Sequence, residues 1–334
     1  MDLPHPGPRN LITDVDGILV GNAGSNPART GVTVVLPERG LVMAAAITGG
    51  APGTRETDAL DPTCLVQEFH GLVLAGGSVF GLAAADAVVN WLSARGRGLA
   101  MGPRTIPVVP AAILFDLANG GDKDWGEAPP YAALGRAAAE AAGTHFSLGN
   151  AGAGLGAKAG RIKGGLGSAS LISGGLQVGA LVAVNPVGAV TLPGQRQFWA
   201  WALERDGEFG GLPPPTTGVG AEPALPVDGR IGGHTTICAI ATNARLDKAG
   251  AERVAIMAHD GLARAIRPAH TPFDGDSVFV MATGALPLDA VAPSDPLAIA
   301  TIGHMAADCL ARAIARGVYA ATSLGDLVAG RDRA

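Results

Sequence analysis

The stretch from Ile231 to Asn243, which reads IGGHTTICAIATN, constrains the fold and the chemistry of this chain more than any other. Two glycines precede His234 and the paired hydroxyls of Thr235 and Thr236, and a run of small and apolar residues follows up to Ala241. Such a run is typical of a strand that is covered on both faces. The sequence therefore predicts a flexible joint that leads directly into a rigid core strand, with two threonines at the junction.

A threonine at the start of a core strand favours one kind of chemistry. If the bond between His234 and Thr235 is cut, Thr235 carries a free α-amine, which can act as the local base for its own hydroxyl. The segment 192–232 contains GGLPPPTTGVG and reads as an exposed connector, which favours processing at this bond. The alternative is a loop followed by an ordinary strand start, since threonine is a good β-former.

Composition narrows the class of protein. Hydrophobic residues make up 48% of the 334 residues and charged residues 16%, which indicates a packed globular chain without disorder. The net charge of −5 argues against a nucleic-acid partner, no apolar run is long enough to span a membrane, and no secretory signal is visible. The three cysteines have no metal-type spacing and read as small buried residues of a reducing compartment, so we expect a cytoplasmic protein.

Apolar patterns predict strands and helices in separate blocks. Strands are expected within 11–21, 31–40, 41–48, 70–75, 106–117, 168–172, 177–184, 237–241 and 277–283. Hairpins are expected to join the second strand to the third and the sixth to the seventh, and 106–117 is expected at a sheet edge or bend because of its prolines. Helices are expected within 79–94, 132–142, 248–266 and 296–316. This order indicates a single α+β layered domain over residues 1–334 rather than a parallel Rossmann sheet.

Several polar residues stand where a pocket could use them. Ser78 follows two glycines at a helix start, where free N–H groups can hold an anion, or where Ser78 is simply the N-cap. Asn185 ends an apolar strand before Pro186, so its amide either points into a pocket or caps the turn. Asp274 and Asp276 are spaced to point to one side of an extended segment, where one of the two carboxylates is expected to be protonated and could shuttle protons. The alternative for this pair is a solvated turn.

The stretch 150–167, NAGAGLGAKAGRIKGGLG, is the most glycine-rich part of the chain. It has neither the P-loop spacing nor the full dinucleotide fingerprint, so we reject nucleotide binding. We expect its backbone N–H groups to line a substrate pocket instead.

Together these stretches resemble the L-aminopeptidase/D-esterase family of N-terminal-nucleophile hydrolases, which includes β-aminopeptidases and the nylon-oligomer (6-aminohexanoate-oligomer) endohydrolases. The resemblance covers nearly the whole chain through ITDVDGILVG, AGGSVFGL, PAAILFDL, GNAGAGLGAKAG, KGGLGSASL, GALVAVNPVG, HTTICAIATNA and FDGDSVFVMATG, in this order. It implies a four-layer αββα sandwich and self-cleavage between His234 and Thr235 into fragments 1–234 and 235–334. It also implies assembly of the processed pairs into a homo-oligomer such as a tetramer.

Residue by residue, the resemblance puts the nucleophile on Thr235, an oxyanion-holding amide on Asn185, and the acidic pair near the new amine on Asp274 and Asp276. His234 stands where the family usually has Asn or Gly, which bears on the rate of self-cleavage.

Two further family positions are less direct. The catalytic lysine of the nylon-oligomer hydrolases falls among Lys158, Arg161 and Lys163; Arg161 could only stabilise charge, and we favour Lys163. Phe115 replaces a pocket tyrosine and so lacks its hydroxyl.

The expected function is hydrolysis of an amide through an acyl-enzyme on Thr235. This hydrolytic mechanism needs no metal and no cofactor. The expected substrates are small peptides, amino-acid amides or linear 6-aminohexanoate oligomers, cut either as an aminopeptidase or as an endohydrolase. The alternatives are acyl transfer to an amine and an uncleaved, non-catalytic binding protein of the same fold.

Overall fold

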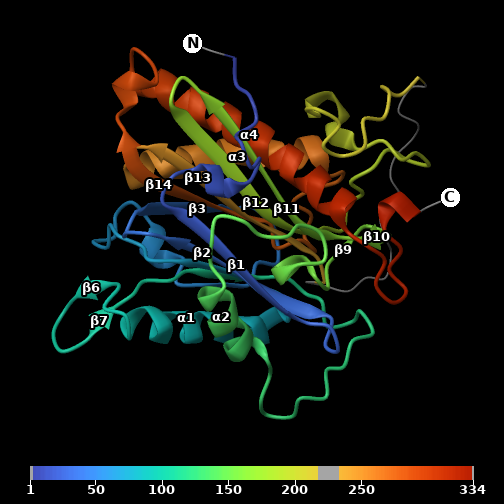
Figure 1. Cartoon of the computed structure of the whole chain (residues 1–334), viewed down its shortest axis with the longest axis horizontal. Helices are drawn as coiled ribbons and strands as arrows, with labels where there is room; N and C mark the ends of the chain where they lie inside the picture. The colour runs from blue at the N-terminus through green and yellow to red at the C-terminus, as the bar shows by residue number, and fades with distance from the viewer. Residues whose placement is uncertain (1–2, 217–232, 333–334) are drawn as a thin grey trace.

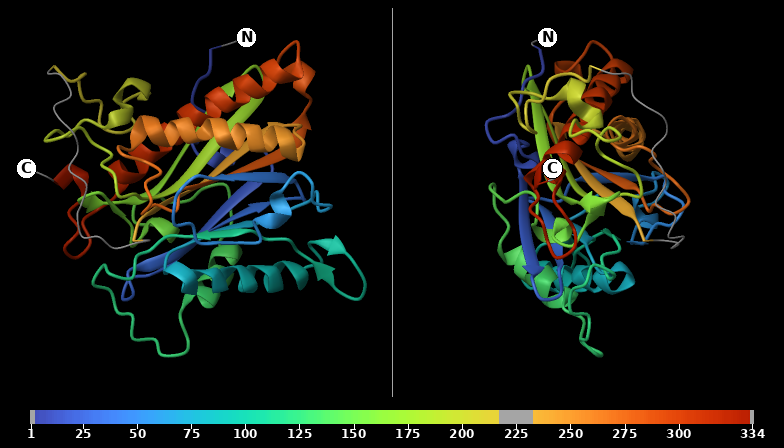
Figure 2. Two further views of the ribbon diagram at one scale, coloured as in Figure 1. Left: turned by 180° about the vertical axis from the view of Figure 1, so that it is seen from behind. Right: turned by 90° about the vertical axis from the view of Figure 1, so that its right-hand side faces the viewer.

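Two five-stranded sheets lie face to face, and helices cover the outer face of each (Figure 1). The computed structural model describes residues 3–216 and 233–332. Helices α1 (Ala83–Ser93) and α2 (Tyr131–Glu140) cover the first sheet, and α3 (Lys248–Ala265) and α4 (Asp295–Ala320) cover the second. The view from behind shows α3 and α4 side by side on their sheet (Figure 2). This is the four-layer αββα sandwich that the resemblance implied.

The strand order brings distant segments together. The first sheet has the order β1 (Ile18–Ser25), β2 (Thr30–Pro37), β5 (Leu72–Ala75), β8 (Ala111–Ile113) and β4 (Thr54–Arg55). The second has the order β11 (Gly165–Ser173), β12 (Leu176–Asn185), β13 (Thr235–Ala244), β14 (Ser277–Leu286) and β3 (Val42–Ile47). Two short ribbons pair β6 (Leu99–Ala100) with β7 (Thr105–Ile106) and β9 (Lys158–Ala159) with β10 (Ile162–Lys163). Short 3-10 helices occupy Ile12–Asp14, Asp58–Leu60, Ser78–Leu82, Gly152–Gly154, Trp199–Leu203, Leu288–Ala290 and Gly330–Asp332.

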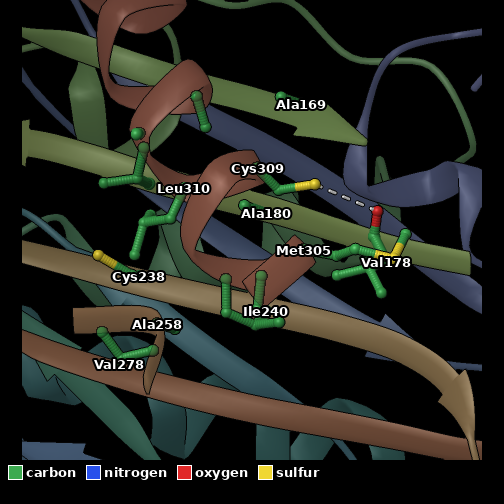
Figure 3. Close-up of a cluster of buried hydrophobic side chains, with 14 of the residues drawn as sticks. Ala169, Val178, Ala180, Cys238, Ile240, Ala258, Val278, Met305, Cys309 and Leu310 are labelled. Atoms are coloured by element: carbon green, nitrogen blue, oxygen red, sulfur yellow. Dashed lines mark hydrogen bonds between the residues drawn. The ribbon is translucent and has the colours of Figure 1, made fainter. Parts of the chain in front are cut away.

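Strand β13 is buried along its whole length, as the apolar run predicted. Its residues alternate between two of the three apolar clusters that fill the spaces between the layers. Cys238 and Ile240 face α3 and α4, while Ile237 and Ala239 face the other sheet. Figure 3 shows Cys238 and Ile240 beside Leu310 of α4. The start of β13 is therefore held from both sides by the core.

Small residues let α4 lie very close to the second sheet. A Cβ atom on Gly167 of β11 would stand 1.8 Å from the carbonyl oxygen of Ala313 in α4, so only glycine fits there. Within the described part of the chain, α4 alone has the length and hydropathy of a membrane-spanning helix, but 67% of its most apolar window is buried. Its apolar character is accounted for by packing against α3, β11 and β12.

Two predicted strand arrangements are wrong. Residues 11–14 do not begin a strand: Ile12–Asp14 form a 3-10 helix, Asp14 Oδ2 accepts the N–H of the N-cap Leu11 at 3.2 Å, and the strand starts at Ile18. Segments 31–40 and 41–48 do not form a hairpin, because β2 pairs with β1 and β5 while β3 pairs with β14 in the other sheet. The turn between them carries the chain from one layer to the next.

The hairpin between β11 and β12 and all four predicted helices are present. The expected edge position of 106–117 is wrong: this segment contributes the short strand β8, which lies between β5 and the two-residue β4.

Candidate functional site

Thr235 and Asn185 face one another across two strands. Thr235 is the first residue of β13, and its partner in the antiparallel register is Asn185, the last residue of β12. Both are buried, with 2% and 1% of their surface exposed. The predicted nucleophile and the predicted oxyanion amide are therefore brought together by strand pairing.

The carbonyl group of His234 is polarised from two directions. The Thr235 hydroxyl donates a hydrogen bond to its oxygen, and the N–H of Gly275 donates another at 3.1 Å. A Cβ atom on Gly275 would lie 2.8 Å from Thr235 Oγ1, so a side chain there would crowd the hydroxyl. The bond between His234 and Thr235 thus has a hydroxyl beside its carbonyl and an N–H donor on its oxygen. Gly275 was not predicted, although it lies between the two predicted aspartates.

The amide of Asn185 is held in one orientation. Its Oδ1 accepts the backbone N–H of Lys158 at 2.8 Å, and its Nδ2 donates to the carbonyl oxygen of Phe115 at 3.3 Å. An amide nitrogen carries two N–H groups, so the second remains to serve a ligand.

A cavity of about 160 Å³ opens beside Asn185 and His234, and Thr235 is not among the residues that line it. It is lined by Phe115, Asp116, Ala118, Asn119, Gly156, Lys158, Asn185, Gly233, His234 and Leu327. Four of the predicted residues meet here: Phe115, Lys158, Asn185 and His234. Asp116 and Asn119 were missed, and the only signal for Asp116 was a charged residue directly after the apolar run PAAILF.

The two aspartates flank the threonine pair and are completely buried. Asp274 accepts hydrogen bonds from the N–H of Val187 at 3.0 Å and from the N–H and hydroxyl of Thr271 at 3.0 and 2.6 Å. Burial, and then the charge of Asp276, raise the pKa of Asp274. The alternative of a solvated turn is therefore wrong.

Asp276 has a different set of partners. It accepts from the N–H of Thr236 at 2.8 Å, and from the backbone N–H and ring Nδ1 of His270 at 3.0 and 2.9 Å. The side chain of Asp276 therefore connects the residue after the nucleophile to a histidine that the sequence reasoning missed.

Lys163 is fully buried and is not among the residues that line the cavity. Its Nζ donates to the carbonyl oxygens of Gly154 and Gly164 at 2.9 and 2.8 Å. Burial lowers its pKa to about 7, with the charge of Asp116 acting in the opposite direction. In the β9–β10 ribbon Lys163 stands directly opposite Lys158, so the two lysines are cross-strand neighbours.

Two other predicted pocket residues lie outside the cavity. Arg161 is exposed at the turn between β9 and β10. Ser78 is the first residue of its 3-10 helix, and the N-cap is Gly77. The glycine turn does hold a carboxylate, but it is one of the protein's own: the N–H of Gly77 donates to Asp116 Oδ1 at 2.8 Å. Burial raises the pKa of Asp116 to about 6.

The described residues contain no cluster of His, Cys, Asp and Glu side chains that could hold a metal ion. The arrangement instead offers a hydroxyl, an amide donor, two buried carboxyl groups and a buried amine. A hydroxyl with a nearby amide donor is a combination that acyl-transfer chemistry can use.

Comparison with known proteins agrees with this geometry. The family model of peptidase family S58 matches residues 10–331. A protein of Mycobacterium bovis named as an uncharacterized aminopeptidase is 44% identical over 97% of each chain. A 6-aminohexanoate-oligomer endohydrolase of Kocuria sp. is 30% identical over 84% of this chain and 77% of its own.

Two solved structures share the fold. A β-aminopeptidase of Burkholderia sp. superimposes with a TM-score of 0.67 at 24% identity, over 96% of this chain and 89% of that one. The L-aminopeptidase D-Ala-esterase/amidase of Ochrobactrum anthropi, described as a variant of the N-terminal-nucleophile hydrolase fold, superimposes with a TM-score of 0.68 at 23% identity and the same coverage.

Proposed function

This chain belongs to peptidase family S58 and is an amide-bond hydrolase, and from that premise we propose that it cuts its own His234–Thr235 bond and then hydrolyses amides through an acyl-enzyme on Thr235. The observation that carries the proposal is the pair of donors on the carbonyl oxygen of His234, one of which is the hydroxyl of Thr235.

In the maturation step, Thr235 Oγ1 attacks the carbonyl carbon of His234. The oxygen becomes negatively charged and is stabilised by the N–H of Gly275, which already lies 3.1 Å away. Collapse of this intermediate breaks the C–N bond, and the nitrogen of Thr235 takes up the proton that Oγ1 lost during the attack and leaves as an amine. The resulting ester between His234 and the Thr235 hydroxyl is then hydrolysed by water, which frees both ends.

In the hydrolysis step, the new α-amine of Thr235 accepts the proton of its own hydroxyl, and Oγ1 attacks the substrate carbonyl. The Nδ2 of Asn185 stabilises the oxyanion, a contribution that is typically about 3 kcal/mol per donor. The leaving amine takes up the proton, and water later hydrolyses the acyl-enzyme. Asp274 and Asp276 orient the α-amine. Lys163 acts as an electrostatic partner from outside the cavity, because its buried Nζ is held by the carbonyl oxygens of Gly154 and Gly164.

The substrates that we propose are small peptides and amino-acid amides, because the relatives at 42–44% identity are named as uncharacterized aminopeptidases. Linear 6-aminohexanoate oligomers are the second candidate, favoured by the 30% identity to endohydrolases that carry this name. We also propose that processed pairs assemble into a homo-oligomer such as a tetramer, which light scattering of the purified protein would measure.

Intact-mass spectrometry under denaturing conditions tests the proposal. Wild-type protein is expected to give two species, residues 1–234 and 235–334, whereas Thr235→Ala gives one full-length species. Thr236→Val is the matched control: it removes a neighbouring buried hydroxyl that has no hydrogen-bond partner among the described residues, and it is expected to be cut as wild type. Cleavage of Thr235→Ala, or hydrolysis of an amide substrate by intact wild-type chain, would refute the role of Thr235.

A further inference from the structure

A chain of hydrogen bonds leads from Asp276 to helix α3. His270 Nδ1 lies 2.9 Å from Asp276 Oδ2 and 3.0 Å from Thr48 Oγ1. Thr48 Oγ1 lies 3.1 Å from Nδ1 of His259, and Nε2 of His259 lies 3.0 Å from the carbonyl oxygen of Ala46. These residues come from the loop before β14, from β3 and the residue just after it, and from α3. None of them lines the cavity beside Asn185.

The donor and the acceptor of each of these hydrogen bonds can be assigned by starting from the carbonyl oxygen of Ala46. The carbonyl oxygen of Ala46 can only accept, so Nε2 of His259 carries the proton. His259 is buried, which lowers its pKa and keeps the ring neutral, so its Nδ1 is an acceptor. The Thr48 hydroxyl must then donate to His259 and accept from His270. Nδ1 of His270 therefore carries a proton, and that proton also faces Asp276.

With these donors and acceptors assigned, the two buried aspartates differ in whether a partner can accept a proton from them. Among the described residues, the three groups that hydrogen-bond to the carboxylate of Asp276 are all N–H donors, and none of them can accept a proton from a neutral carboxyl. One partner of Asp274 is the hydroxyl of Thr271, which can rotate and accept the proton of a neutral Asp274. Since two like charges so close favour protonation of one, the hydrogen bonds decide which one.

We propose that His270 is a positioning residue that keeps the negative charge of the aspartate pair on Asp276 and leaves Asp274 neutral. The proposal rests on the function proposed above, because it concerns the same site. Asp274 pairs with His234 through a bridge between their backbones, whereas Asp276 contacts the N–H of Thr236. A neutral Asp274 therefore keeps a second negative charge away from the carbonyl of His234, where the oxyanion develops during maturation.

The groups that face His270 come from each element around it. Asp276 belongs to the same loop, and Asp274 interacts with it electrostatically. The ring of His259 on α3 stands against that of His270, with 4.8 Å between the ring centres, and Asp260 acts on His259 from the next position of α3.

Asparagine and aspartate have nearly the same shape, so replacing His270 by each in turn tests the effect of the N–H donor at constant side-chain size. His270 has a φ of +57°, a conformation that asparagine and aspartate both tolerate. His270→Asn keeps an N–H donor toward Asp276, whereas His270→Asp replaces it with a third carboxylate. His304→Asp is the control, because it makes the same change at an exposed position on α4.

Self-cleavage and amide hydrolysis would be followed from pH 5 to pH 9 in each variant. His270→Asp is expected to slow both by roughly tenfold to a hundredfold, as for a lost hydrogen bond to a charged group, and to move the acid limb of the pH–rate profile to higher pH. His270→Asn is expected to retain most of both rates and to leave the acid limb of the pH–rate profile at the same pH. Equal losses in both variants with an unmoved limb would show that His270 has only a structural role and overturn the proposal.

A measurement that does not depend on activity separates this inference from the proposed function. In Thr235→Ala protein labelled with ¹³C at the aspartate carboxyl carbons, NMR titration would assign the buried carboxyl that keeps its proton at neutral pH, with Asp274→Asn and Asp276→Asn for assignment. A proton on Asp274 that is lost or moved in His270→Asp supports the inference even if wild type never cleaves. A proton on Asp276, or none on either residue, refutes it even if wild type cleaves as proposed.

Discussion

Replacing the buried Lys163 by methionine should change how stability depends on pH. Burial lowers the pKa of Lys163 from its ordinary value of 10.5 to about 7, so the folded protein releases this proton more easily than the unfolded chain does. The difference corresponds to a cost of about 5 kcal/mol when the amine must be charged in the folded state. The cost is fully present below pH 7 and disappears as the pH rises toward 10.5, because the unfolded chain binds more protons in that range.

The wild type should therefore gain about 1.4 kcal/mol of unfolding free energy per pH unit between pH 7 and pH 10, relative to Lys163→Met. At pH 7 the variant does not gain the full cost of charging the buried amine. Methionine leaves the carbonyl oxygens of Gly154 and Gly164 without their donor, which lowers the free energy of unfolding by about 1–3 kcal/mol for each. Lys163→Met should thus leave the free energy of unfolding nearly unchanged at pH 7 and clearly lower it at pH 10.

Urea unfolding at pH 7, 8, 9 and 10 measures this slope. Both chains would carry Thr235→Ala, so that each unfolds as one intact polypeptide. Lys158→Met is the matched control, since Lys158 is the cross-strand partner of Lys163 but only half-buried, and it should show no such slope. A difference between wild type and Lys163→Met that stays constant from pH 7 to pH 10 would refute the reasoning.

Two further predictions concern the packing of α4. Gly167→Ala should lower the free energy of unfolding by about 2–5 kcal/mol, because its Cβ would collide with the carbonyl oxygen of Ala313. Gly143→Ala is the control: its Cβ would meet open space, so the same urea titration should show a far smaller loss. Arg312→Leu should lower the free energy of unfolding by about 3–5 kcal/mol, because Arg312 and Glu208 form a buried ion pair at 2.6 Å. Thermal unfolding measures this loss, and a value below about 1 kcal/mol would mean that the pair contributes no more than an exposed one.

Much of the site could be predicted because its residues follow regular elements. The strand that begins at Thr235 and the strand that ends at Asn185 are both apolar runs with clear ends, so polar residues at those ends were natural candidates. Their pairing also explains why motifs about fifty residues apart meet in one site. The roles of Thr235, Asn185 and the aspartates remain predictions that the experiments above test.

The residues that were missed act through contacts that no local pattern reports. Asp116 reaches the cavity because a glycine turn from another part of the first sheet holds its carboxylate. His270 matters because β3 and α3 bring Thr48 and His259 to it. Gly275 matters because its N–H lies against the carbonyl of His234. Each of these depends on segments that are distant in sequence or on a backbone distance.

The sequence by itself determined the four long helices and most of the buried strands, through apolar periodicity, and the order of its motifs identified the family. Only the tertiary structure decided which sheet each strand joins, as the separation of β2 from β3 shows, and which polar groups meet. The physical reason is that periodicity and turn chemistry act over a few residues, whereas sheet pairing and the protonation of buried groups depend on partners from the whole chain.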